Sequence, residues 1–180
     1  MDEQLLIERL KSGDRRAIDS LVNQYKAPLF AFILRMTGNP ENTEDLFQET
    51  WIRVMRSIRM FRGESKFSTW LFQIAVNLVR DEQRKSKGKS HIPLDEFPDI
   101  LSCPPGVDPF TLMKARRVRE IIETLPPKMK EAIVLKYFHD FSDAEIAEVA
   151  GCPEGTVKSR LFHAAQAIKK KWEYAELKKE

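Results

Sequence analysis

The stretch FSDAEIAEVAGCPEGTVKSRLFHAAQAIKKK, residues 141–171, has the pattern of a helix-turn-helix. Ser142 is a good N-cap residue and Glu145 follows three positions later, which predicts a capping box at the start of a short helix. Gly151 is expected to end that helix, and Pro153 precedes a second helix that begins near Glu154. A glycine at this position allows the sharp turn that the motif needs.

The second helix of this motif has two chemically different faces. Its apolar residues recur at helical spacing and predict an inner stripe of Val157, Leu161, Ala164 and Ile168. Its other face carries side chains suited to phosphates and base edges: Lys158, Ser159, Phe162, His163 and Gln166. We therefore expect a recognition helix that reads DNA. A plain helical hairpin with a solvated basic face is the alternative.

Length and composition bound the remaining possibilities. The chain has 180 residues, 42% of them hydrophobic, which is enough for one or two cores, and a net charge of +3. Two basic blocks, in residues 62–90 and 154–180, flank an acidic block in residues 91–110. A nucleic-acid binder with two contact surfaces would show this distribution, although charge runs are more often solvated faces. No apolar run approaches 18 residues and no export leader is recognisable, so we expect a cytoplasmic protein.

The first part of the chain predicts three core helices. The first spans about Glu3 to Lys11. Asp14 is expected to cap a second helix, and Pro28 is expected to open a third, which Gly38 ends.

A fourth helix is expected at residues 41–59, after Asn39-Pro40. Its buried stripe is predicted to consist of Phe47, Trp51, Val54, Met55 and Ile58. The opposite face is polar but includes an exposed isoleucine: Asp45, Gln48, Glu49, Ile52 and Arg56. Such a strip suggests docking against another protein, with ordinary helix surface as the alternative.

The segment RGESKF, residues 62–67, predicts a polar turn before a helix over residues 67–85. Apolar residues follow helical spacing on one face of that helix, and polar ones populate another: Thr69, Gln73, Asn77, Arg80, Asp81 and Arg84. Aromatic residues beside a basic turn can hold unstacked single-stranded bases, since stacking is worth about 1–3 kcal/mol per base. For Trp70 itself, we favour packing in the core.

Helical periodicity is absent between residues 87 and 110, where prolines alternate with acidic residues, so this segment is predicted to be a linker. Two further helices, about residues 111–124 and 127–138, are expected to support the helix-turn-helix. No strand pattern competes. The predicted fold is all-α, with two small helical domains at residues 1–86 and 111–180 joined by a flexible acidic Pro-rich linker.

Three stretches together resemble bacterial sigma factors of the extracytoplasmic-function (ECF) type. EDLFQETW, residues 44–51, resembles that family's clamp-binding motif, and KFSTWLFQIAVNLVRDEQRK, residues 66–85, resembles its −10 promoter-reading helix. LPPKMKEAIVLKYFHDFSDAEIAEVAGCPEGTVKSRLFHA, residues 125–164, resembles its −35-reading domain. The stretches follow the family's order and cover nearly the whole chain, which is far more specific than a lone helix-turn-helix.

The resemblance implies a role for particular residues. The polymerase β′ clamp would be contacted by Asp45, Gln48, Glu49 and Ile52. The −10 DNA would be contacted by Arg62, Gly63, Ser65, Lys66, Asn77, Arg80, Arg84 and Lys85. The −35 DNA would be contacted by Thr156, Lys158, Ser159, Arg160, Phe162 and His163. The implied partners are core RNA polymerase, through its β′ clamp and β subunits, promoter DNA and an anti-sigma factor. The family often has arginine where His163 and Ala165 stand, so the −35 sequence that this helix reads is open.

Two other classes of protein are alternatives. A helix-turn-helix regulator that acts without polymerase would leave the strip at residues 45–56 unexplained. An enzyme is not expected, because the sequence has no phosphate loop, no metal-ligand cluster and no nucleophile with an evident base. Cys103 and Cys152 have no metal-like spacing with the three histidines, so we expect neither metal nor cofactor.

Overall fold

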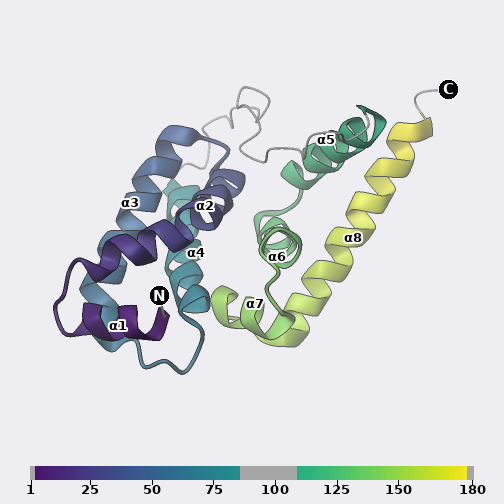
Figure 1. Ribbon diagram of the computed structural model, residues 1–180. Coiled ribbons are helices and arrows are strands. Elements are labelled where there is room, and N and C mark those ends of the chain that lie inside the picture. The colour runs from purple at the N-terminus through teal and green to yellow at the C-terminus, as the bar shows by residue number, and fades with distance from the viewer. Residues whose placement is uncertain (1–2, 86–108, 178–180) are drawn as a thin grey trace. The chain divides into compact units, whose positions relative to one another are not determined.

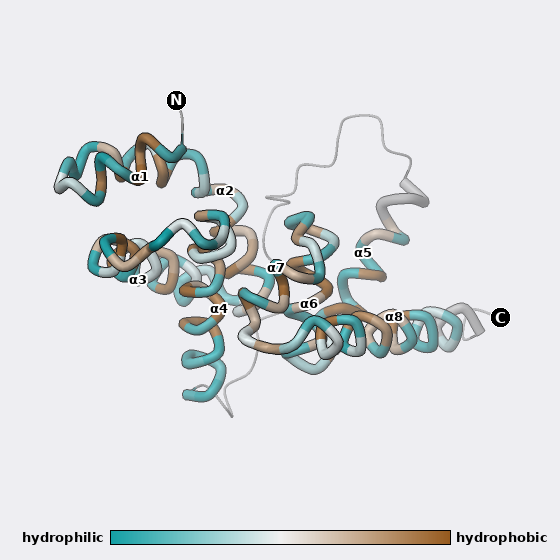
Figure 2. Tube along the Cα trace, turned by 90° about the horizontal axis from the view of Figure 1, so that it is seen from below, coloured by the Kyte–Doolittle hydropathy of each residue, from teal (hydrophilic) through white to brown (hydrophobic). Residues whose placement is uncertain are grey.

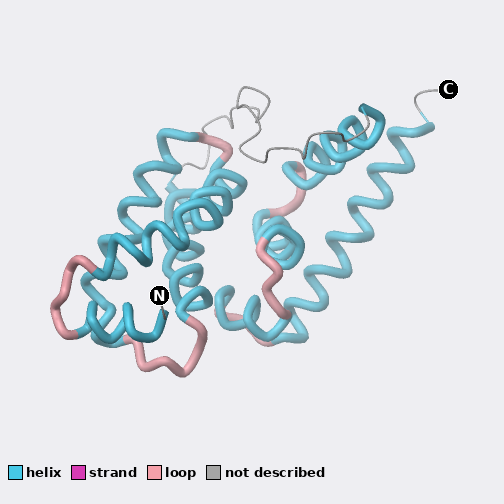
Figure 3. The backbone as a smooth tube through the Cα atoms, viewed as in Figure 1, coloured by secondary structure: helices cyan, strands magenta, loops and turns pink. Residues whose placement is uncertain are grey.

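The computed structural model describes residues 3–85 and 109–177, and every regular element within those ranges is a helix (Figures 1 and 3). The chain divides into two compact units, the first containing α1 to α4 and the second built around α5, α6 and α8. The all-α prediction is confirmed. Residues 87–108 of the predicted linker lie outside the described residues, and residues 109–110 already belong to α5.

The first unit consists of α1 (Glu3–Lys11), α2 (Ala17–Thr37), α3 (Pro40–Ser57), the short 3₁₀ helix η1 (Ile58–Met60) and α4 (Phe67–Lys85). Helices α2, α3 and α4 pack against one another, and α1 packs against α2 (Figure 1). Large buried side chains from α2 and α4 meet in the core. The rings of Phe32 and Phe72, for example, lie 5.3 Å apart between centroids.

Helix α2 continues through Pro28, so the prediction of two separate helices there is wrong. An internal proline removes one backbone hydrogen bond and costs about 3 kcal/mol. Leu29, Phe32 and Ile33 follow it immediately, and each has 0% of its surface exposed. Burying such side chains contributes about 1.5–3 kcal/mol apiece, which outweighs the local cost. Gly38 ends α2 as predicted, with a φ of 63° and its N–H donating to the Leu34 carbonyl.

Asp14 closes the turn between α1 and α2 and is not the N-cap of α2. The helix begins at Ala17, and its N-cap position is Arg16. One carboxylate oxygen of Asp14 accepts the Arg16 backbone N–H at 3.1 Å, and the other accepts two hydrogen bonds from the Arg9 side chain. The hydrogen bond from Arg9 is the main reason that the pKa of Asp14 lies below its ordinary value. Asp14 therefore links the end of α1 to the start of α2 through its side chain.

Helix α3 starts where the sequence predicts, because Asn39 caps it by accepting the Asn42 N–H at 3.1 Å. It ends two residues earlier than expected and passes into η1. The hydroxyls of Thr37 and Thr43 are buried and lie 2.8 Å apart, which joins the end of α2 to the start of α3. Helix α4 has the predicted bounds, and its last turns are hydrophilic (Figure 2).

The second unit consists of α5 (Pro109–Glu123), α6 (Pro127–Phe138), α7 (Asp143–Ala150) and α8 (Glu154–Leu177). Helix α8 packs against α5 and α6, and it carries both apolar and polar residues along its length (Figure 2). A core cluster joins these three helices: Ile122, Leu125, Ile133 and Ala164. At its edge the largely buried Lys130 Nζ lies 2.5 Å from Glu123 Oε2, which compensates the buried ammonium.

Candidate functional site

The strip predicted on α3 is exposed to solvent. Asp45, Gln48 and Ile52 are exposed and Glu49 is partly exposed. Positions three and four residues apart share one face of a helix, so these four side chains form one surface. Ile52 keeps 44% of its surface accessible, whereas Trp51 beside it keeps 7%. An exposed apolar side chain among acidic and amide groups suits a protein partner better than the phosphate backbone of DNA.

Glu49 also makes an ion pair within the helix. Its Oε1 accepts a hydrogen bond from Arg53 Nε at 3.0 Å, one helical turn later. Their side chains remain 39% and 44% exposed, respectively. Exposed ion pairs at this spacing contribute only about 0.3–0.5 kcal/mol to stability. Either side chain can therefore leave the pair for another contact at small cost.

The basic turn between η1 and α4, residues 62–66, is flanked by a group of aromatic rings. Arg62, Gly63 and Lys66 are exposed and Ser65 is partly exposed, and Gly63 has a φ of 76°, which favours glycine. Three rings pack at its base with centroids 5.1 to 5.9 Å apart: Phe61, Phe67 and Trp70.

Trp70 differs from its two aromatic neighbours in burial. Phe61 and Phe67 are buried, whereas Trp70 is only partly buried, so the packing predicted for it is present but incomplete. The ammonium of Lys11 lies 5.4 Å from the Phe61 ring centroid and adds a cation from α1. A basic turn beside a partly accessible indole is a surface on which an unstacked base could lie.

The polar face of α4 is only in part as predicted. Asn77, Arg84 and Lys85 are exposed and Arg80 is partly buried. Arg84 is paired with Asp81 at 2.5 Å on the same helix. Thr69, which was expected on this face, is instead buried, with 1% of its surface exposed.

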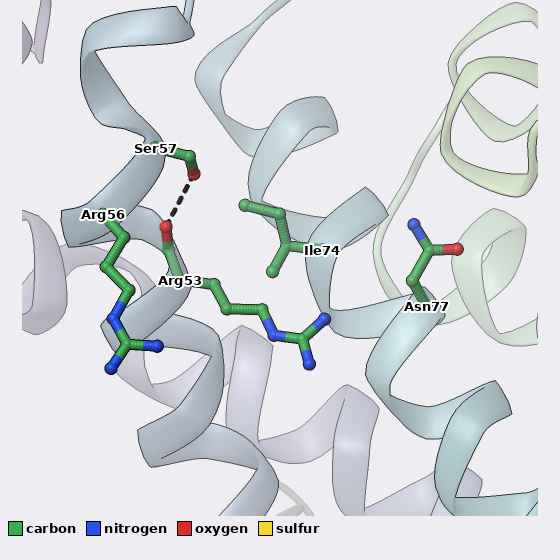
Figure 4. A pocket seen from close by; sticks show the side chains of 5 residues that line it. All are labelled: Arg53, Arg56, Ser57, Ile74 and Asn77. Atoms are coloured by element: carbon green, nitrogen blue, oxygen red, sulfur yellow. Dashed lines mark hydrogen bonds between the residues drawn. The ribbon is translucent and has the colours of Figure 1, made fainter.

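A pocket of about 270 Å³ opens between α3 and α4. It is lined by Arg53, Arg56, Ser57, Ile74 and Asn77 (Figure 4). The Arg53 side chain extends from α3 towards Ile74 and Asn77, whereas the Arg56 guanidinium points away from Asn77. No sequence motif assigns a role to Arg53. The Glu49–Arg53 spacing of four residues is the signal that could have drawn attention to it.

The predicted helix-turn-helix is present in α7 and α8. Ser142 and Glu145 form the capping box, with the Glu145 N–H donating to Ser142 Oγ at 3.2 Å and the Ser142 N–H donating to Glu145 Oε2 at 2.8 Å. Gly151 has a φ of 63° and turns the chain between the helices. Val157 and Ala164 of α8 are fully buried, as the inner stripe requires.

The outer face of α8 presents four of the predicted DNA-contacting residues. Lys158, Ser159, Phe162 and His163 are exposed, and Phe162 keeps 59% of its surface accessible. The Phe162 and His163 rings meet edge to face, with 5.5 Å between centroids. Lys158 Nζ lies 2.8 Å from Glu154 Oε1, and this hydrogen bond is the main reason that the pKa of Lys158 is raised.

Two other residues predicted for this face are less accessible. Thr156 and Arg160 are partly buried. The Arg160 Nη1 atom is buried, and within the described part of the chain it has no hydrogen-bond partner. The role of Arg160 in DNA binding stays a prediction.

The described residues offer little to other kinds of site. No group of three or more histidine, cysteine or acidic residues there could hold a metal ion. None of the helices described is both long and apolar enough to cross a membrane.

Sequence comparison places known families on both units. Residues 21–89 match the model of Sigma-70 region 2, and residues 115–168 match that of Sigma-70 region 4. The chain is 33% identical over 181 residues to the ECF RNA polymerase sigma-E factor of Escherichia coli K12, covering 95% of this chain and 94% of that protein. It is 32% identical over 179 residues to the RNA polymerase sigma-H factor of Pseudomonas aeruginosa, covering 93% and 92%.

Solved structures share the fold. The structure of CnrH in complex with the cytosolic domain of CnrY matches with a TM-score of 0.72 at 21% identity, covering 96% of this chain and 97% of that one. The sigma factor RpoE from Bartonella quintana, solved with the anti-sigma factor NepR, matches with a TM-score of 0.63 at 22% identity, covering 85% and 94%.

Proposed function

This chain belongs to the ECF family of RNA polymerase sigma factors, and we propose that it directs core polymerase to promoters through three surfaces of its own. Residues 1–86 form the domain that binds the β′ clamp and the −10 element, the linker runs from residue 87 to the start of α5, and the domain from α5 onward, residues 109–180, binds the −35 element. The observation that carries the proposal is the 33% identity to a sigma-E factor across 95% of the chain.

The clamp surface is the strip on α3. Asp45, Gln48, Glu49 and Ile52 share one helix face, and the exposed isoleucine supplies the apolar contact around which a protein interface forms. A regulator that acts without polymerase would have no use for such a strip beside its DNA-binding surfaces. Family membership also favours the sigma factor over that alternative.

The DNA surfaces are the basic turn with the outer face of α4, and the outer face of α8. The first acts on separated −10 strands through Arg62, Gly63, Ser65, Lys66, Asn77, Arg80, Arg84 and Lys85. The second reads the −35 duplex through Thr156, Lys158, Ser159, Arg160, Phe162 and His163. Backbone contacts would position the protein, and contacts to base edges would supply the sequence preference.

The partners follow from this assignment. They are core RNA polymerase through its β′ clamp and β subunits, promoter DNA, and an anti-sigma factor of the kind that binds RpoE in the Bartonella quintana complex. The protein acts in the cytoplasm, where polymerase and promoters are found, and is not itself an enzyme. Reconstitution tests this: the purified chain should enable core polymerase to start transcription at a defined set of promoters. Transcription that is equally specific without the chain would contradict the proposal.

A further inference from the structure

Helix α8 extends well beyond the residues that form the helix-turn-helix. It runs from Glu154 to Leu177, whereas the match to Sigma-70 region 4 ends at residue 168. Its C-terminal half lies beside α5 (Figure 1). This half is the more basic one: residues 154–165 carry two basic residues and one acidic residue, and residues 166–174 carry three and one. The three basic residues are Lys169, Lys170 and Lys171, and none of them belongs to the set assigned to the −35 element.

Contacts with α5 and the core support this part of α8. The guanidinium carbon of Arg117 lies 5.5 Å from the centroid of the Trp172 ring. Lys171 Nζ donates a hydrogen bond to the hydroxyl of Thr124, directly after the end of α5. Ile168 packs against the core cluster of this unit. Because the helix is held on its inner side, helix geometry determines where its outer side chains lie relative to the recognition residues.

Lys169 and Lys170 continue the recognition face of α8. Lys169 follows Lys158 by eleven residues and Lys170 follows Ser159 by eleven residues, which is about three turns of an α-helix. Both lysines are exposed. Lys171 is the next residue, and its hydrogen bond at the end of α5 directs it away from this face. Two of the three adjacent lysines are therefore aligned with the side chains proposed to read DNA, and the third is not.

The two aligned ammonium groups can take up a new partner. Lys170 makes no ion pair or hydrogen bond with any of the described residues. Lys169 Nζ lies 3.9 Å from Glu173 Oε1, and the two side chains are 72% and 61% exposed. Solvent screens an ion pair that is so exposed and so long, so Lys169 can leave it at little cost.

Lys169 and Lys170 lie far enough along α8 to reach the edge of the groove that the helix reads. In helix-turn-helix proteins the N-terminal residues of the recognition helix contact base edges in the major groove. At about 1.5 Å per residue, Lys169 lies about 16–17 Å further along the helix than Lys158, whereas the major groove is only about 12 Å wide. When Lys158 reaches base edges, Lys169 and Lys170 are therefore beside the phosphates that border the groove.

We propose that Lys169 and Lys170 bind phosphates of the promoter backbone beside the −35 element and form a sequence-independent anchor for the recognition helix. The proposal rests on the proposed function, because it extends the −35 surface along α8. A lysine is a point charge with three N–H donors and no acceptor, which suits phosphate oxygens. The anchor adds affinity at every site and positions the helix, while Lys158 and its neighbours supply the sequence preference.

Salt dependence of DNA binding tests the proposal on the full chain. Two fluorescein-labelled duplexes of equal length, one with the preferred −35 element and one of mixed sequence, are titrated by anisotropy between roughly 50 and 200 mM salt. Each neutralised phosphate of B-DNA contributes about 0.9 to the slope of log affinity against log salt, so Lys169→Gln with Lys170→Gln should lower the slope by about 1.8 on both duplexes. Over this range the wild type should lose about 12-fold more affinity than the double variant. The ratio of the affinities for the two duplexes should stay the same.

Lys171→Gln is the matched control. It removes the same charge from the next residue, but from a side chain that is hydrogen-bonded at the end of α5, and it should leave the slope unchanged. Lys169→Arg with Lys170→Arg keeps both charges and should keep the slope. Glutamine and arginine have helix propensities close to that of lysine, so circular dichroism should show the same helix content in all variants.

Three results would overturn the proposal. The first is an unchanged slope in the glutamine double variant, or a fall in Lys171→Gln that is equally large per charge. The second is weaker binding to core polymerase with unchanged DNA slopes, which would assign Lys169 and Lys170 to a protein interface. The third is a loss of affinity for the −35 duplex alone, which would make them base readers. Failure of the proposed function is read separately, as absence of promoter-specific transcription by the wild-type chain with core polymerase.

Discussion

Lys158 Nζ lies 2.8 Å from Glu154 Oε1, one helical turn earlier on α8. The Lys158 side chain is 63% exposed and that of Glu154 is 48% exposed, so the pair is readily exchanged for a contact with DNA. The hydrogen bond to Glu154 raises the pKa of Lys158 above its ordinary value. The recognition helix therefore presents an ammonium that is oriented by its own helix.

Lys158→Ala is expected to cost about 1–3 kcal/mol on the preferred −35 element and to flatten preference at one base pair, because a lysine in the major groove can donate to guanine O6 and N7. Titration against a panel of single-base −35 variants at two salt concentrations measures both effects. Uniform weakening across the panel, with a loss of about one unit of salt slope, would make Lys158 a phosphate contact instead.

Replacing Asp45, Gln48 and Glu49 together by alanine is expected to abolish binding to core polymerase and to preserve the helical fold. Exposed positions of this kind usually change stability by about 0.5 kcal/mol each, so unfolding would not explain the loss. Affinity for core enzyme can be measured by fluorescence anisotropy, with circular dichroism as the control for folding. Unchanged affinity would contradict the assignment of the α3 strip.

Asn77→Ala combined with Arg80→Ala is expected to leave polymerase binding intact and to impair strand opening. The reason is that these side chains act on separated strands rather than on closed duplex. Permanganate reactivity of promoter thymines reports opening directly, and normal reactivity in the double variant would show that the −10 assignment is wrong.

Trp51→Phe is expected to change the free energy of unfolding by less than about 1 kcal/mol. The indole N–H of Trp51 is buried, and it has no hydrogen-bond partner in the part of the chain that the structure describes. Phenylalanine has no such N–H, so the substitution removes the cost of about 1–3 kcal/mol for burying an unpaired donor. This gain offsets the weaker apolar packing of the smaller phenyl ring. Trp51→Ala should cost about 3–5 kcal/mol. Urea unfolding measures both changes. Equal losses in the free energy of unfolding for Trp51→Phe and Trp51→Ala would contradict this account.

The Asp14 carboxyl is expected to titrate with a pKa below its ordinary value, because the hydrogen bond from Arg9 stabilises its charged form. Because the pKa of Asp14 is lower in the folded state, the ion pair adds to the stability of the protein when the pH is above the pKa of Asp14 in the unfolded chain. This contribution is lost as the pH falls through the pKa of Asp14 in the folded protein. Carbon-13 NMR of the carboxyl group measures the pKa, and Arg9→Gln should move it upward. A pKa that does not change in Arg9→Gln would mean that the ion pair has no effect on Asp14.

Local sequence signals predicted most element boundaries because short-range chemistry determines them. Asn39 and the Ser142–Glu145 box cap their helices through their own side chains, and α4 and α6 have the predicted bounds. Continuity of α2 across Pro28 could not be predicted in this way, because it depends on burial against other helices.

The candidate sites also contain some features that follow from local sequence and others that depend on packing between helices. Helical spacing correctly placed Asp45, Gln48 and Ile52 on an exposed face, because position on a single helix determines it. The pocket beside Arg53 requires two helices to be adjacent, and the inward Nη1 atom of Arg160 depends on how α8 packs. Neither property can be read from periodicity alone.

Promoter opening with purified components tests the central claim most directly. The full chain, core RNA polymerase and promoter DNA are combined, and thymine reactivity to permanganate is mapped near the start site. The account predicts reactive −10 thymines only when all three components are present, and their loss when Asp45, Gln48 and Glu49 are replaced by alanine. Opening that does not require the chain, or that survives the triple replacement with full yield, would contradict it.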